Sequence, residues 1–110
     1  MINKTILDSY DWQEAFQYAD FGIDEVKNVI AYEEGENDGA SWVLVAELND
    51  GRFGYVDAWC DYTGWDCQAG GSSGTADTLE DLKRWELTSS IRRRLNMVLE
   101  DLDSTPTQYQ

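Results

Sequence analysis

Apolar residues recur at helical spacing near both ends of the chain. In residues 11–20 they lie three or four positions apart, as on one face of a helix, and Asp11 with Glu14 fits a capping box at the start of that helix. Near the other end, Thr88 or Ser89 is expected to cap a last helix. One stripe of that helix is predicted to be buried, and it consists of Ile91, Leu95, Val98 and Leu102.

A shorter helix is expected just before this last one. Asp77 and Glu80 fit a second capping box at its start. Leu79, Leu82 and Trp85 then fall on one side of the helix, where they are predicted to face inward. Both C-terminal helices are therefore expected to add apolar side chains to the core.

The middle of the chain has the shorter pattern of β-strands. Residues 28–33, 41–48 and 52–60 predict three strands, whereas residues 60–75 are rich in Gly and Ser and are expected to form a long loop. This order of elements predicts an α+β fold, with a three-stranded antiparallel sheet and helices packed on one face. Residues 1–103 are expected to form this single domain, and residues 104–110 a frayed C-terminal tail.

The turn between the last two predicted strands sets their register. Asp50-Gly51 is typical of a two-residue hairpin turn, which would place Asp57 opposite Leu44 in an otherwise apolar strand. A half-buried carboxylate there needs a partner. The arginines at 92–94 have no acidic residue four positions later, so we expect them to pair with carboxylates elsewhere in the fold, Asp57 among them.

The charge of the chain limits the partners that it can bind. The formal net charge is −14, and residues 1–77 carry 16 carboxylates against three cations. Such a field repels nucleic acid and anionic membranes and attracts basic protein surfaces. Two simpler explanations of the acidic composition remain open. Acidic residues favour solubility in general, and a salt-loving host would also favour an acidic surface. There is no apolar run long enough to span a membrane and no signal peptide at the N-terminus, so we expect a cytoplasmic protein.

Two cysteines flank the most unusual stretch of the sequence. Cys60 and Cys67 are separated by six residues, which is not a standard zinc spacing. Free thiols are the favoured state in a reducing cytosol, with a disulfide and a metal site as alternatives. A metal- or ligand-binding module built on this loop is therefore a second hypothesis for function. No cofactor is expected.

Enzymatic chemistry has little support in the sequence. Histidine is absent, and the Gly-Ser stretch at 70–74 lacks the lysine of a phosphate-binding loop. Asp57 and Asp61 could serve as the acid pair of a small hydrolase, which is the third hypothesis. We expect that the protein is not an enzyme.

One part of the chain resembles small acidic proteins encoded by bacteriophages and prophages. The resemblance is carried by Gly35-Glu36-Asn37-Asp38-Gly39, Ser41-Trp42, Asp50-Gly51-Arg52 and Cys60-Asp61-Tyr62-Thr63-Gly64-Trp65-Asp66-Cys67-Gln68. It covers about a third of the chain and implies no particular activity. Small acidic phage proteins often bind a host protein, as nucleic-acid mimics and anti-CRISPR inhibitors do.

The leading hypothesis is an acidic interaction protein that binds a basic host or phage protein, such as one that handles nucleic acid, without binding nucleic acid or membrane itself. Carboxylates on two loops would form a charged row, and two aromatic residues of the second loop would act as anchors. The candidate partner-binding residues are Glu33, Glu34, Glu36, Asp38, Asp61, Tyr62, Trp65 and Asp66. The exposed strand edges would also permit a homodimer.

Overall fold

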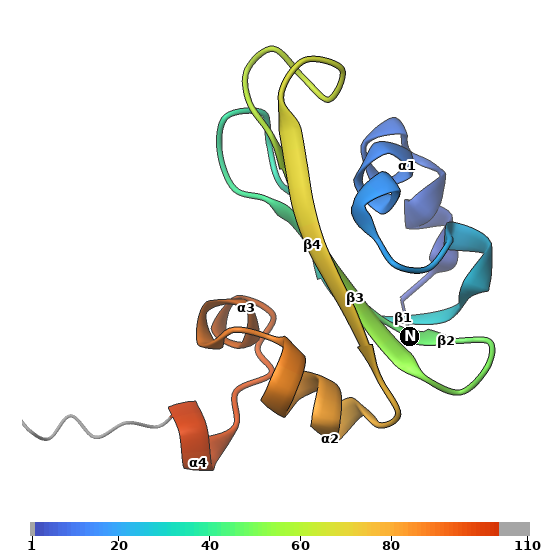
Figure 1. Ribbon diagram of the computed structural model, residues 1–110, viewed down its shortest axis with the longest axis vertical. Coiled ribbons are helices and arrows are strands. Elements are labelled where there is room, and N and C mark those ends of the chain that lie inside the picture. Colours follow the sequence, from blue (N-terminus) through green and yellow to red (C-terminus); the bar gives the residue numbers. More distant parts are fainter. Residues whose placement is uncertain (1, 104–110) are drawn as a thin grey trace, which may run out of the picture.

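Four antiparallel strands form one sheet, in the order β1-β2-β3-β4, in the computed structural model, which describes residues 2–103 (Figure 1). The strands are β1 (Val26–Glu33), β2 (Trp42–Leu48), β3 (Phe53–Cys60) and β4 (Ala69–Ala76). The α+β class and the first three strands are confirmed. The prediction of three strands is wrong because β4 lies in the stretch assigned to a loop.

The strand β4 has almost no side chains of its own to signal a strand. Its pairing with β3 is unbroken along its whole length. Hydrogen bonds to the backbone of β3 therefore hold this segment in the extended conformation. Aromatic side chains from other segments cover its glycines, with Trp59 against Gly70 and Tyr18 against Gly71. A strand covered in this way lacks the alternating pattern that sequence reasoning requires.

The loop of the β2–β3 hairpin begins one residue earlier than predicted. The N–H of Leu48 donates to the carbonyl of Arg52 at 2.8 Å, which leaves three residues in the loop. Gly51 closes this loop with φ of +92°, the left-handed conformation typical of three-residue hairpins. The register therefore shifts by one, and Asp57 lies opposite Val43 instead of Leu44.

Helices cover both faces of the sheet, which corrects the prediction of helices on one face (Figure 1). One face is covered by η1 (Lys4–Asp8), α1 (Tyr10–Ala15), η2 (Phe16–Tyr18) and η3 (Ile23–Glu25). The other packs against α2 (Leu79–Asp81), η4 (Leu82–Glu86) and α3 (Ser89–Arg94), which α4 (Glu100–Asp103) follows. The strand β2 requires both layers because its residues are buried on both sides.

The helix boundaries differ from the predicted ones at the caps. Ser9 caps α1 and Thr78 caps α2, each one or two residues away from the expected aspartate. Thr88 caps α3 as predicted. A wide turn in η4, closed by Leu87 N–H to the Leu82 carbonyl, accompanies an outward placement of Trp85.

The last predicted helix is broken into two pieces. The segment α3 ends at Arg94, and Asn96 follows with φ of +60°. Ile91 and Leu95 are buried as expected, but Val98 and Leu102 lie beyond the break and are about half exposed. Within residues 2–103, the structure has no helix of the length and apolar character needed to cross a membrane.

Two of the three arginines pair with carboxylates more than ten positions away, as predicted, although Asp57 is not one of their partners in the described residues. Arg92 is buried and donates two hydrogen bonds to Asp103, at 2.6 and 2.8 Å. Its remaining amino group donates to the carbonyls of Lys83 and Leu87. Arg94 pairs with Glu33 at 2.7 Å. Arg92 thus joins η4, α3 and α4 into one unit.

The ion pair of Arg92 predicts how the stability of this C-terminal unit depends on pH. Hydrogen bonds from Arg92 and from the Leu99 N–H lower the pKa of Asp103 to about 2. The pair therefore contributes its full stability above about pH 5, where Asp103 is ionised in both folded and unfolded chains. That contribution is lost as the pH falls towards 2. Acid unfolding of Asp103→Asn and of the native chain measures the difference, which is expected to vanish at the acid end. An equal difference at pH 2 and pH 7 would contradict this.

Candidate protein-binding site

Two loops meet at the end of the sheet where β3 ends and β4 begins. They span residues 34–41 and 61–68, and their backbones are directly connected (Figure 1). The N–H of Asp38 donates to the carbonyl of Cys60 at 2.9 Å, and the Cys60 thiol donates to the Asn37 side chain at 3.2 Å. The two acidic loops of the sequence therefore lie side by side.

The helix α1 joins these loops as a third segment. The indole N–H of Trp65 donates to Asp11 at 3.0 Å, which connects the second loop to α1. The indole N–H of Trp12 donates to Glu34 at 3.3 Å, which connects α1 to the first loop. Buried aromatic rings thus supply the donors that position carboxylates at this end of the molecule.

We call this region the acidic end, and it carries few cations. Its carboxylates are Asp11, Glu14, Glu33, Glu34, Glu36, Asp38, Asp61 and Asp66. Among the described residues, Glu33 alone of this set forms an ion pair, with Arg94. Lys27 and Arg52 pair with acidic residues at the opposite end of the strands. Eight of the chain's 22 carboxylates therefore lie in one region, where the ion pairs of the described residues place a single cation, Arg94.

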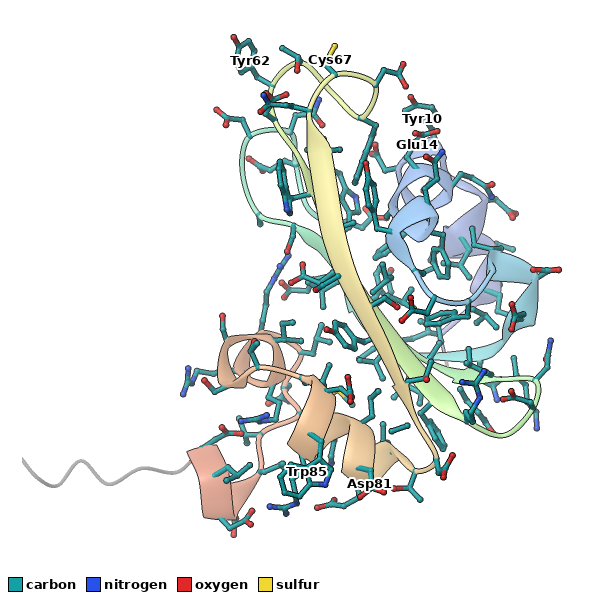
Figure 2. All side chains as sticks on the ribbon, viewed as in Figure 1. Tyr10, Glu14, Tyr62, Cys67, Asp81 and Trp85 are labelled. Carbon is teal, nitrogen blue, oxygen red and sulfur yellow. The ribbon has the colours of Figure 1, made fainter. Side chains whose placement is uncertain are left out.

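Two tyrosines project from the acidic end (Figure 2). Tyr62 is 77% exposed on the second loop and Tyr10 is 61% exposed at the start of α1. Dehydration raises the pKa of the Tyr10 hydroxyl, and the charges of Asp66, Glu14 and Asp11 raise it further. Tyr10 therefore stands among carboxylates of α1 and of the second loop, and Tyr62 is exposed on that same loop.

The candidate residues divide into exposed and structural ones. Glu33, Glu34, Glu36, Asp38, Tyr62 and Asp66 are exposed. Asp61 is partly buried, and its carboxylate accepts hydrogen bonds from the backbone and the hydroxyl of Thr63. Trp65 is 8% exposed and packs on Trp42, with ring centroids 5.0 Å apart. Because it is buried, Trp65 does not offer the aromatic anchor that the sequence suggested.

Sequence reasoning missed the residues that α1 contributes. Tyr10, Asp11 and Glu14 lie on or beside the polar side of this helix, which the pattern had correctly shown to be amphipathic. In the sequence, Asp11 and Glu14 fit a capping box, and no pattern relates their charges to those of the two acidic loops. The sequence contained no sign that this helix would pack next to residue 66.

The alternative sites receive no support from the geometry. Both cysteines are free, and residues 2–103 contain no cluster of three His, Cys, Asp or Glu side chains that could bind a metal. Asp57 and Asp61 stand four residues apart on and just beyond β3, about 13 Å along an extended chain. Paired catalytic carboxyl groups of glycosidases lie about 5–9.5 Å apart.

The two thiols are expected to react at very different rates. Cys67 is exposed, whereas Cys60 is buried. Burial raises the pKa of the Cys60 thiol, and the charges of Asp11 and Asp61 raise it further. Because the thiolate is the reactive form, a thiol-reactive dye should label one cysteine rapidly in the folded protein and the second only after unfolding. Cys67→Ser should remove the rapid phase and Cys60→Ser should retain it. Labelling of neither thiol would instead indicate a disulfide.

Comparison of the chain with protein-family models, curated proteins and solved structures gave no match.

Proposed function

We propose that this protein is an interaction protein whose acidic end binds a basic surface of a protein that handles nucleic acid. The observation that supports it is the joining of two loops and α1 into one region with many carboxylates and one paired cation among the described residues. Like charges placed close together cost stability in the free protein. A basic partner would remove that cost on binding.

The binding surface combines charge with two exposed aromatic groups. Carboxylates steer a basic partner to the acidic end and select it over neutral or acidic proteins. Tyr62 and Tyr10 supply area that a partner can bury, and tyrosine is common among the residues that dominate binding energy. In this proposal Tyr62 takes the anchoring role first assigned to Trp65.

Competition with nucleic acid is the biological effect that this surface would have. A basic protein surface that normally contacts phosphates would be occupied by carboxylates, so the protein would act as an inhibitor or as a nucleic-acid mimic. The resemblance to small acidic phage proteins is consistent with such a role, including that of an anti-CRISPR inhibitor. Neither a metal nor a cofactor takes part in it.

Affinity capture from a bacterial lysate tests this proposal. The tagged protein is expected to retain one nucleic-acid-handling protein, which elutes in a salt gradient because the contact is electrostatic. Duplex DNA added to the lysate should compete for the captured protein. Capture that is insensitive to both salt and DNA would contradict the proposal, as would the absence of any specific capture.

A further inference from the structure

One sheet face is only partly covered by the C-terminal helices. The segments α2 and α3 lie over the half of the sheet nearer the end of β4 (Figure 1). On β3 their cover includes Phe53 and Tyr55. Side chains alternate along a strand, so Asp57 and Trp59 point to this same face but lie beyond those residues. Trp59 is 46% exposed.

Asp57 has a carboxylate that the described part of the chain does not satisfy. Its Oδ1 atom is buried and has no hydrogen-bond partner in residues 2–103. Arg94 donates to Glu33 and Ser41 instead. Glu33 lies opposite Val43 on β1, and Val43 lies opposite Asp57 on β3. A partly dehydrated carboxylate without a donor costs free energy. A cation supplied from outside would offset that cost.

Trp59 lies two positions from Asp57 on the same face of β3, and it is partly exposed to solvent. Its indole lies over Gly70, where an added Cβ atom would come within 2.7 Å of the ring. Gly70 therefore provides a flat seat for the indole, and the rest of the ring stays open to a ligand. The indole of Trp59 and the carboxylate of Asp57 lie two positions apart on one strand face. A cation bound there would contact both the face of the ring and the carboxylate.

We propose that Asp57 and Trp59 form a binding site for an arginine side chain of the protein partner. This inference rests on the proposed function, because it specifies which side chain the basic partner inserts. The planar guanidinium stacks on the indole while its N–H groups donate to the carboxylate. Lysine can make only part of this arrangement, because its ammonium is a compact charge without a planar face.

An NMR titration of the free protein tests the site without any partner. The probe is acetyl-arginine-amide, with acetyl-citrulline-amide as a neutral analogue of nearly the same shape. The indole N–H signal of Trp59, identified by its loss in Trp59→Phe, is expected to shift in a saturable manner with the arginine probe and not with citrulline. Asp57→Asn should weaken this binding about tenfold, because one charged hydrogen bond is lost.

Trp85 serves as an internal control, since it is 73% exposed on the C-terminal helices. Its indole signal should stay in place during the titration. The proposal is overturned if the Trp59 signal does not move, if Trp85 moves equally, or if Asp57→Asn binds as tightly as the native chain. A successful titration followed by unchanged capture with Asp57→Asn would overturn the role of the site in partner binding. Failed capture with a positive titration would count against the proposed function alone.

Discussion

Replacing Arg92 with alanine is expected to destabilise the fold by about 3–5 kcal/mol, the cost of removing one partner of a buried ion pair. The substitution leaves the buried Asp103 carboxylate without its guanidinium. The carbonyl oxygens of Lys83 and Leu87 also lose the hydrogen bonds that Arg92 donates to them. These oxygens must then stay buried without a donor or become hydrated. Urea unfolding followed by fluorescence measures the change.

Arg93→Ala is the matched control for this prediction. Arg93 is exposed on the same helix, so its removal is expected to change the free energy of unfolding by no more than about 0.5 kcal/mol. Equal stabilities for the two variants would show that the C-terminal unit does not depend on Arg92. Replacing Arg92 and Asp103 together by apolar residues should restore part of the loss, because the unpaired charge is then absent.

Replacing Trp65 with alanine is expected to cost about 3–5 kcal/mol, as for other large aromatic side chains in a core. Its ring packs on Trp42 and Tyr18, and its N–H donates to Asp11. Thermal or urea unfolding measures the loss. Tyr62→Ala, three residues away and 77% exposed, should change stability by no more than about 0.5 kcal/mol.

These two substitutions also separate folding from binding at the acidic end. Trp65→Ala is expected to lower capture through loss of structure, whereas Tyr62→Ala should lower capture in a protein that unfolds like the native chain. Full stability of Trp65→Ala would contradict the structural role assigned to this residue. Unchanged capture with Tyr62→Ala would remove Tyr62 from the proposed surface.

The sequence predicted the parts of the fold where side chains carry the pattern. The strand β2 and most of β1 and β3 have apolar runs, and α1 has an apolar face, so all four elements were found. The strand β4 was missed because glycine and serine make it a strand only beside β3. The register error arose because Asp50-Gly51 fits a two-residue turn as well as the end of a three-residue one.

The candidate site was predicted only in part, because the sequence shows which residues are charged but not which segments pack together. Residues of the two loops could be listed from charge alone, but their meeting depends on hydrogen bonds such as that from Asp38 to Cys60. The burial of Trp65 depends on α1 and on Trp42, which are distant in the chain. The contribution of Tyr10 and Glu14 depends on tertiary packing in the same way.

Two variants of equal net charge test the central claim most directly. One neutralises four exposed acids of the acidic end, with Glu34→Gln, Glu36→Gln, Asp38→Asn and Asp66→Asn. The other neutralises four exposed acids elsewhere, with Asp8→Asn, Asp24→Asn, Asp77→Asn and Asp81→Asn. In the capture experiment, we predict that the first variant loses the partner and that the second retains it. Equal capture by both variants, or equal loss, would contradict a binding site at the acidic end.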